Sequence, residues 1–346
     1  MTPKGSFENQ FDDYSLDIAA NIINDAKDGI SEKFQTKLQN FKTMKLQLLK
    51  TKMESDIFYD STVYTGSAGL ALYYFMCSLK NDASSQESLK MALEYLDIEN
   101  LKGRRISFLC GDAGPLAIAT VISYKLGTKR NDKILPDYKT LAHRLMSLIS
   151  LLNESPDEIL YGKAGYLYAL LFVNKHINGK EIIPVNHIEK VINSILKSGK
   201  QYSAQMKSDS PLLWHWHDKV YFGAAHGMAG ILYMLLQIFE EEKYMKVALQ
   251  CGDLIWQRGL CTKGYSICHG VSGNAYAFIQ LFQATKRPLY LYRACCFMEW
   301  CAVERPGTEL HRPDRPASLF EGLSGRLYLA EDITRIAEAR FPAFGL

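Results

Sequence analysis

The chain has 346 residues, of which 47% are hydrophobic and 12% aromatic, so it can bury a large core and is not an intrinsically disordered protein. Its 40 basic and 37 acidic residues nearly balance, which gives no electrostatic case for binding nucleic acid or a membrane surface. The start of the sequence has no apolar segment typical of a signal peptide, and no apolar run reaches membrane-spanning length. We therefore expect a cytoplasmic protein without an integral membrane segment.

The eight cysteines are scattered through the chain without the spacing of a disulfide framework. This usage is typical of a protein in the reducing cytosol. Free cysteine is among the most buried residue types, so we expect most of the eight to be small core residues. Cys268 is the exception, because it is followed by a histidine in a glycine turn.

A glycine turn followed by an apolar segment recurs along the chain. Its six copies, in chain order, are YTGSAG, LCGDAG, YGKAG, AHGMAG, CHGVSG and EGLSG. The apolar segments after them begin GLALYYF, GPLAIAT, GYLYALL, GILYMLL, GNAYAFI and GRLYLAE. Between the copies lie amphipathic segments with apolar residues at helical spacing, such as ESLKMALEYL and HIEKVINSIL. Each repeat therefore predicts a helical hairpin, with an outer amphipathic helix, a turn and an inner apolar helix.

The repeat predicts an all-α protein with a single domain over residues 1–346. Helical hairpins stack as an open solenoid or close into an α/α toroid, and the nearly all-apolar inner helices favour the toroid. The glycines allow a tight turn, through a positive φ or a close backbone approach that a side chain would block. Four copies also place a tyrosine three residues after the second glycine, namely Tyr168, Tyr233, Tyr276 and Tyr328.

Cys268 and His269 stand together in one turn and offer a soft and a borderline metal ligand. The pair alone is a weak signal, and a core cysteine beside an exposed histidine is the alternative. A catalytic zinc site uses three protein ligands and an open position, and His226 occupies the matching slot of the preceding turn. The segment from His215 to His217 favours a packed loop over a metal site.

Charged side chains accompany the same turns. Asp112 and Glu321 lie at helix starts, where the helix dipole stabilises a carboxylate without any catalysis. Lys263 and the segment 311–316 add basic residues to neighbouring loops, and solvated surface is the alternative for both. Because the repeats share one geometry, we expect these groups to lie at the same end of the hairpins.

Taken together, these motifs resemble the eukaryotic LanC-like proteins, relatives of the bacterial lanthionine cyclases. The resemblance covers nearly the whole chain and rests on SFLCGDAGPLA, YFGAAHGMAG, GYSICHGVSGNAYAF, YLYRACCFMEWC, SLFEGLSG and RFPAFGL. It implies an α/α toroid of seven helical hairpins around a cavity that bears zinc. The chemistry it implies is the addition of glutathione, as a zinc-activated thiolate, to dehydroalanine or dehydrobutyrine residues of a peptide or protein.

The resemblance also implies roles for individual residues. Cys268 and His269 match two of the three zinc ligands, and the third is a cysteine of a Trp-Cys-His-Gly turn. His226 matches the acid/base histidine that protonates the enolate formed by the addition, and Asp112 matches its partner carboxylate.

The glutathione contacts of the family correspond to four residues in two loops. Lys263 matches one of them, and the stretch Arg312, Pro313 and Asp314 matches the others. His311 stands where an arginine is expected.

One repeat of the family is missing from this chain, between the Ala-His-Gly turn and the Cys-His-Gly turn. Gly227 and Gly270 are 43 residues apart, which leaves room for a single unit, and that unit reads as the head of one family repeat joined to the tail of the next. The missing part carries the first zinc cysteine, and Ala225 stands in its slot. We therefore expect zinc binding to be weakened or lost.

Two functions from different classes remain open on the sequence alone. The first is a glutathione transferase, and the second is a glutathione-binding adaptor protein with weak or no catalysis because a zinc ligand is missing. Helical-toroid glycosidases or terpenoid cyclases share only the architecture, and they need paired acids or an Asp-rich metal motif, whereas the carboxylates here are separate.

Overall fold

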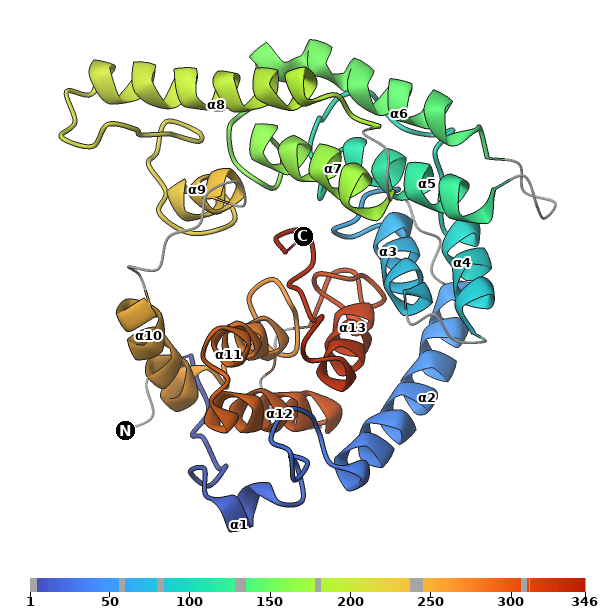
Figure 1. Ribbon diagram of the computed structural model, residues 1–346, viewed down its shortest axis with the longest axis vertical. Coiled ribbons are helices and arrows are strands. Elements are labelled where there is room, and N and C mark those ends of the chain that lie inside the picture. Colours follow the sequence, from blue (N-terminus) through green and yellow to red (C-terminus); the bar gives the residue numbers. More distant parts are fainter. Residues whose placement is uncertain are drawn as a thin grey trace. The chain divides into compact units, whose positions relative to one another are not determined.

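The structure is a computed structural model that describes residues 5–55, 60–79, 84–127, 135–177, 182–236, 245–305, 310 and 312–345. The described residues form helices joined by turns, with isolated β-bridges and no strand (Figure 1). The all-α class predicted from the sequence is thereby confirmed. No helix in the described part of the chain is both long enough and apolar enough to cross a membrane.

The chain divides into two compact units. The terminal unit consists of Met1–Ile57 and Glu241–Phe341, and the central unit of Phe58–Glu240 and Pro342–Leu346. The prediction of a single domain over residues 1–346 stays a prediction.

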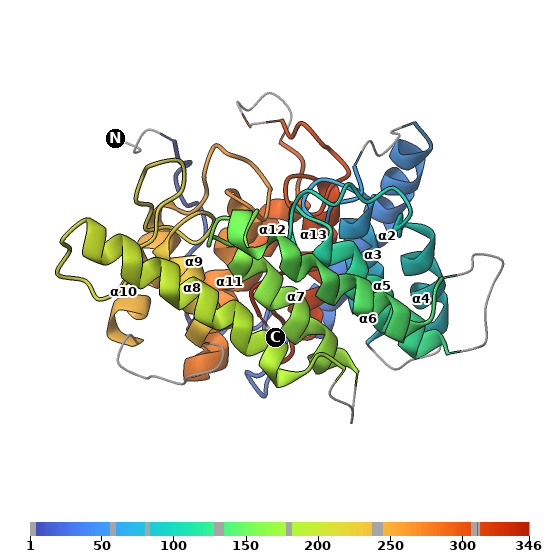
Figure 2. The same cartoon turned by 90° about the horizontal axis from the view of Figure 1, so that it is seen from above.

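The central unit contains three complete helical hairpins. Its helices are α3 (Ser67–Ser78), α4 (Ser85–Glu94), α5 (Ala113–Leu126), α6 (Tyr138–Ser147), the 3₁₀ helix η1 (Leu148–Glu154), α7 (Lys163–His176), α8 (Val185–Gln205) and α9 (Met228–Leu236). In chain order α3 packs on α4, α5 on α6 and α7 on α8, while α9 packs on α7. Figure 2 shows α6 and α8 running along one side of α5 and α7.

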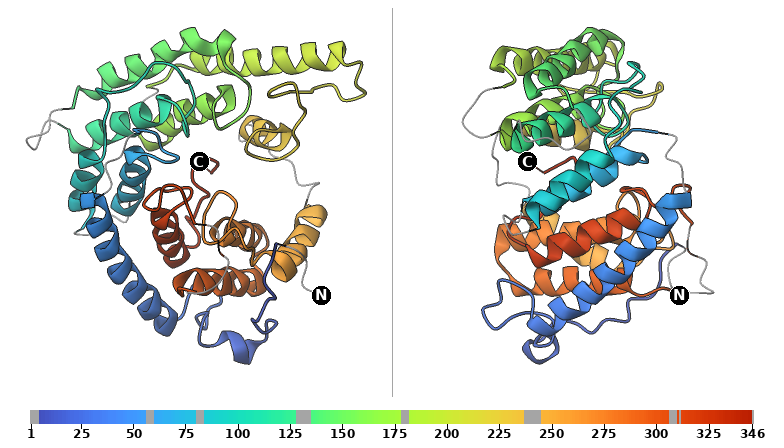
Figure 3. Two further views of the ribbon diagram at one scale, coloured as in Figure 1. Left: turned by 180° about the vertical axis from the view of Figure 1, so that it is seen from behind. Right: turned by 90° about the vertical axis from the view of Figure 1, so that its right-hand side faces the viewer.

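The terminal unit combines an N-terminal segment of the chain with a segment from its C-terminal third. Its helices are α1 (Leu16–Ala19), α2 (Glu32–Ser55), α10 (Met245–Arg258), α11 (Val271–Thr285), α12 (Pro288–Ala302) and α13 (Leu323–Thr334). Helices α11 and α12 form a hairpin, and α10 packs on α11. Helix α2 packs on α13, although the two are far apart in sequence (Figure 3).

Most of the apolar helices after the glycine turns are largely buried, as the sequence predicts. Most residues of α3, α5, α7 and α13 are buried. In contrast, α4, α6 and α8 bury only one face. The inner and outer roles of the two kinds of helix therefore hold in the central unit, where the difference follows from the apolar pattern. In the terminal unit α11, which follows a glycine turn, has eight buried residues out of 15, whereas its hairpin partner α12 has 11 out of 15.

Glycine is required in the turns because the backbone folds back closely on itself. A Cβ at Gly114 would collide with the carbonyl oxygen of Phe108, and one at Gly273 with the carbonyl oxygen of Ile267. Neither glycine has a positive φ. Of the two reasons that the sequence offers for these glycines, close backbone approach is the one that applies.

Candidate functional site

The residue four positions before the first glycine holds each of five turns in shape. Its side-chain oxygen accepts a hydrogen bond from the backbone N–H of the residue directly before the glycine. The donor and acceptor pairs are Thr65 to Thr62 (3.4 Å), Cys110 to Ser107 (3.3 Å), Tyr161 to Glu158 (2.7 Å), His269 to Ser266 (3.4 Å) and Glu321 to Ser318 (3.3 Å). The turn thus fixes the backbone of the residues that the sequence singles out, His269 and Glu321 among them.

In the fourth turn His226 is the residue directly before the first glycine, and it lies among aromatic rings of the central unit. Its ring stacks on Trp216, with centroids 3.9 Å apart and planes 2° from parallel, and it faces Tyr161 at 5.9 Å. The loop from His215 to His217 is therefore packed against the turn, in line with the sequence interpretation. The side chain of His226 keeps a quarter of its surface exposed.

The carboxylate that holds His226 is Glu158, which lies outside the sequence motifs described above. The Nδ1 atom of His226 lies 3.0 Å from Glu158 Oε2, and the Glu158 side chain is only 2% exposed. The same carboxylate accepts backbone N–H groups from Leu160 at 2.8 Å and Tyr161 at 2.7 Å. One signal in the sequence could have found it, because Glu158 replaces the serine that stands at this position in three other turns.

Burial changes the proton affinity of both members of this pair. It raises the pKa of the Glu158 carboxyl to about 7, against the opposing effect of its two backbone hydrogen bonds. Burial also lowers the pKa of His226, and the nearby His217 lowers it further. Both shifts disfavour charge, so the pair takes up or releases a proton near neutral pH. Such behaviour suits a group that exchanges protons with a substrate.

Asp112 makes a different contact. It is the N-cap residue of α5, and its Oδ2 atom accepts the backbone N–H of Gly103 at 2.5 Å. The structure thus pairs His226 with Glu158 and places Asp112 in a helix-start turn. The catalytic role that the resemblance implies for Asp112 stays a prediction.

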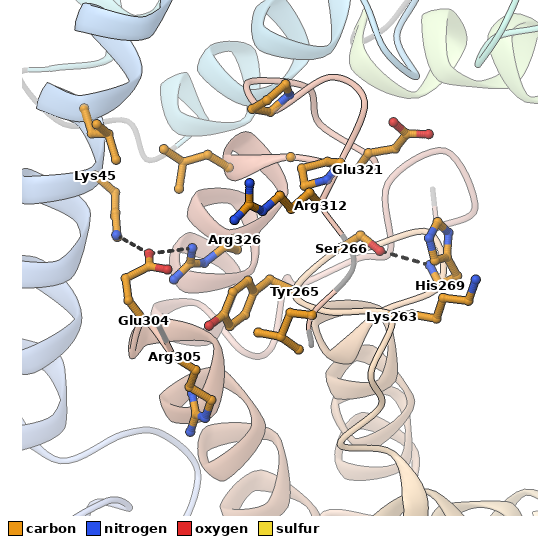
Figure 4. A pocket seen from close by; sticks show the side chains of 16 residues that line it. Lys45, Lys263, Tyr265, Ser266, His269, Glu304, Arg305, Arg312, Glu321 and Arg326 are labelled. Atoms are coloured by element: carbon orange, nitrogen blue, oxygen red, sulfur yellow. Dashed lines mark hydrogen bonds and ion pairs between the residues drawn. The ribbon is translucent and has the colours of Figure 1, made fainter. Parts of the chain in front are cut away.

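A pocket of about 690 Å³ in the terminal unit gathers several of the predicted site residues (Figure 4). Lys263, His269, Arg312 and Pro313 all line it. The remaining lining residues are Lys45, Leu48, Tyr265, Ser266, Glu304, Arg305, Leu310, Pro316, Glu321, Gly322, Leu323 and Arg326. Cys268 is half-buried beside His269, whereas Asp314 is exposed and does not line the pocket. His311 lies outside the described residues.

The charge of this pocket favours an anionic ligand. Five cationic side chains line it, namely Lys45, Lys263, Arg305, Arg312 and Arg326, against two carboxylates, Glu304 and Glu321. Its volume is within the range of about 300–1,000 Å³ that small-molecule sites usually span. A small molecule with more than one carboxylate therefore fits both the size and the charge of the pocket.

The turn that contains Cys268 and His269 has too few protein ligands for a catalytic zinc site. Cys268 and His269 are adjacent and both are candidate ligands, but two protein ligands are fewer than the three of a catalytic zinc site. Among the residues that the structure describes, no three His, Cys, Asp or Glu side chains gather in a way that could hold a metal ion. The donor set therefore fits zinc poorly.

Known proteins with similar sequences cover nearly the whole chain. It is 33% identical to glutathione S-transferase LANCL1 of Danio rerio over 411 residues, which include 99% of this chain and 100% of that protein. It is 26% identical to LanC-like protein GCL1 of Arabidopsis thaliana, over 82% of this chain and 81% of that protein. Among solved structures, nisin cyclase is similar with a TM-score of 0.45 and 15% identity, over 84% of this chain and 83% of that one.

The model of the family described as lanthionine synthetase C-like protein matches residues 57–238 and 235–346. These two segments include all six glycine turns, and the helical hairpins agree with the fold class predicted for the chain. The family that the sequence motifs indicate is therefore confirmed, and this chain belongs to the LanC-like family.

Proposed function

We propose that this chain is a glutathione transferase that adds the thiol of glutathione to dehydroalanine or dehydrobutyrine residues in a peptide or protein. The observation that carries the proposal is the cationic pocket, which brings Lys263, Arg312 and Pro313 together with His269. The name of the Danio rerio relative supports the same activity. We also propose that the protein acts in the cytoplasm, where glutathione is the abundant thiol.

The pocket residues would bind the thiol substrate and favour its reactive form. Glutathione carries two carboxylates, and Lys263 and Arg312 are cations that can pair with them. Positive charge near a thiol also lowers its pKa and increases the fraction of thiolate, which is the nucleophile. In the addition, a carbon–sulfur bond forms at the β-carbon, the carbon–carbon double bond breaks, and an enolate remains at the α-carbon.

The enolate must receive a proton, and we assign this step to His226 on the strength of the family resemblance. Glu158 holds Nδ1 of the ring, so Nε2 is the atom that can exchange the proton. The pair retains a proton near neutral pH because burial raises the pKa of Glu158 to about 7. Glu158 is a positioning residue in this scheme, since it acts through the histidine.

We infer that the chain holds zinc weakly or not at all, because Ala225 stands in the slot of the first zinc cysteine. Three observations support a missing repeat at this place. The two segments that match the family model meet at residues 235–238, and the boundary between the two compact units falls at 240/241. The alignment with the Danio rerio relative is 411 residues long, whereas this chain has 346. Residues 237–244 themselves lie outside the described part.

A glutathione-binding adaptor protein is the second candidate, and Ala225 is the observation that favours it. To separate the two, the protein is incubated with glutathione and a dehydroalanine peptide, and the thioether adduct is detected by its mass. A transferase yields the adduct faster than glutathione alone. The variants Lys263→Met and Arg312→Met should slow the reaction, while Arg315→Gln, which alters an exposed arginine outside the pocket, should not. Glutathione binding without any adduct would favour the adaptor.

A further inference from the structure

The pocket has a second group of charges away from Lys263 and His269, built by residues from three segments of the terminal unit (Figure 4). Glu304 Oε1 accepts hydrogen bonds from Lys45 Nζ at 2.5 Å and from Arg326 at 2.9 Å. We call these three residues the Glu304 cluster. Lys45 comes from α2 and Arg326 from α13, so the packing of these two helices creates the cluster.

Arg326 has a structural place in the cluster. Its guanidinium group also donates to the carbonyl oxygen of Cys301, with an Nε distance of 2.8 Å, and lies 4.2 Å from the centroid of the Tyr265 ring. Its side chain is 7% exposed. These contacts use most of its donors, so Arg326 fixes the position of Glu304 and adds positive charge behind it.

The ammonium group of Lys45 has more N–H donors than the acceptor Glu304 uses. The Lys45 side chain is only 5% exposed, yet it lines the pocket. An ammonium group has three N–H donors, and within the described residues Glu304 is the one hydrogen-bond acceptor that the structure gives it. Burying a charged group whose donors lack partners is costly. A carboxylate oxygen of a bound ligand would satisfy these donors.

Glu304 offers the complementary group. Its side chain is 55% exposed, and both ion pairs fall on Oε1, which leaves Oε2 to accept a proton donor from a ligand. Although burial acts in the opposite direction, the hydrogen bonds from Lys45 and Arg326 keep the pKa of Glu304 below its ordinary value. The group is therefore a carboxylate at neutral pH. A cation and a carboxylate side by side match the two charges of an α-amino acid head.

We propose that Lys45 and Glu304 form a subsite for the zwitterionic head of the γ-glutamyl arm of glutathione. Lys45 donates to the α-carboxylate, and Glu304 accepts from the α-ammonium group. The assignment rests on the proposed function, because it concerns how the same thiol is recognised. The glycine arm carries a carboxylate without an ammonium group, so Lys263, which lies beside His269 and away from the Glu304 cluster (Figure 4), suits that end of the molecule.

The test compares altered ligands with altered side chains by calorimetric titration of the full chain. The ligands are glutathione, 4-aminobutanoyl-cysteinylglycine, which lacks the α-carboxylate, and glutaryl-cysteinylglycine, which lacks the α-ammonium group. The variants are Lys45→Met and Glu304→Gln. Lys37→Met is the matched control, since this lysine lies on the same helix and pairs with Glu299 at 2.5 Å but does not line the pocket.

We expect Lys45→Met to weaken glutathione binding about tenfold or more and to leave the ligand without the α-carboxylate nearly unaffected. Glu304→Gln should weaken glutathione binding and leave the binding of the ligand without the α-ammonium group nearly unaffected. Lys37→Met should change the binding of none of the three ligands. Equal weakening of all three ligands by Lys45→Met, or unchanged glutathione binding, would overturn the subsite while the proposed function stands. Absence of glutathione binding by the unaltered protein would overturn both. Removing either charge from the ligand tests the unaltered protein as well, so the result does not depend on how the variants fold.

Discussion

At the scale of single residues, Glu158 combines two tasks that the other turns keep apart. Its Oε1 atom shapes the turn as a serine hydroxyl does elsewhere, while Oε2 reaches His226 at 3.0 Å. The longer side chain makes the second contact feasible, because a serine at this position ends at the turn itself. His226 thereby receives a fixed ring orientation from a neighbouring repeat.

Replacing Glu158 with glutamine should change the pH dependence of the transferase reaction. The variant lacks a carboxyl group with a pKa of about 7, so we expect kcat/KM to lose its inflection near pH 7 and to fall by up to about a hundredfold. The measurement is kcat/KM for adduct formation between pH 5.5 and pH 8.5. Asp112→Asn is the comparison variant, because the resemblance implies the carboxylate role for Asp112, whereas in the structure its side chain accepts the backbone N–H of Gly103. A profile that keeps its inflection in Glu158→Gln and loses it in Asp112→Asn would assign the role to Asp112 instead.

At the scale of helices and turns, the repeat constrains the chain through the backbone of its glycines. We expect Gly273→Ala to lower the free energy of unfolding by about 2–3 kcal/mol, because its Cβ would collide with the carbonyl oxygen of Ile267. The control is Gly223→Ala, whose Cβ would meet no atom within 4 Å, and its effect should stay within about 0.5 kcal/mol. Urea unfolding of the two variants measures both values. Equal stability of the two would show that the turn can relax around a side chain.

The pairing of α11 with α13 includes a buried carboxyl group that should make stability depend on pH. Tyr276 donates a hydrogen bond to Asp332 Oδ2 at 2.9 Å, and burial raises the pKa of Asp332 to about 7. The folded state therefore binds a proton more tightly than the unfolded state. This stabilising contribution is complete below about pH 4 and is lost as the pH rises through 7.

The Asp332→Asn variant should lack that dependence, because asparagine keeps an oxygen for Tyr276 and does not titrate. For the unaltered protein we expect the Asp332 contribution to fall by up to about 4 kcal/mol between low pH and pH 8. The difference in unfolding free energy between the protein and the variant, measured at pH 5 and pH 8, isolates this group. The same difference at both pH values would contradict the raised pKa of Asp332.

The hairpins could be predicted from the sequence because their signals are local, but parts of the site could not. Each inner helix can be identified from a stretch of about fifteen residues, because the glycine turn and the apolar periodicity both lie within it. The Glu304 cluster instead depends on α2 packing on α13, which brings Lys45 to a residue more than 250 positions away. The tyrosines three residues after the second glycine of a turn also show that an equivalent position in the repeat does not predict equal burial. Tyr168, Tyr276 and Tyr328 are at most 4% exposed, but Tyr233 in the equivalent position is 37% exposed.

At the scale of the whole molecule, the proposed loss of one repeat would separate two properties that the family resemblance joins. The pocket with Lys263 and Arg312 is described within one unit and needs no residue from the absent segment. The family resemblance places the first zinc cysteine in that segment, and Ala225 stands in its slot. We therefore expect glutathione recognition to persist while metal binding declines.

Metal analysis of the purified protein tests the second half of that expectation. We predict clearly less than one zinc per chain after dialysis, and no measurable decrease in glutathione affinity after treatment with a chelator. Cys268→Ser should remove whatever zinc remains, because only Cys268 and His269 of the implied ligands are present at that turn. One tightly held zinc per chain would contradict the weakened site.

The central claim is that this chain acts as a glutathione transferase although Ala225 stands where the family resemblance implies a zinc cysteine. The most direct test is adduct formation by protein of known metal content. The measurement is the mass of a dehydroalanine peptide after incubation with glutathione, with and without the protein. The predicted result is a protein-dependent mass increase of one glutathione per dehydroalanine. Protein that binds glutathione but forms no adduct beyond the control without protein would contradict the claim.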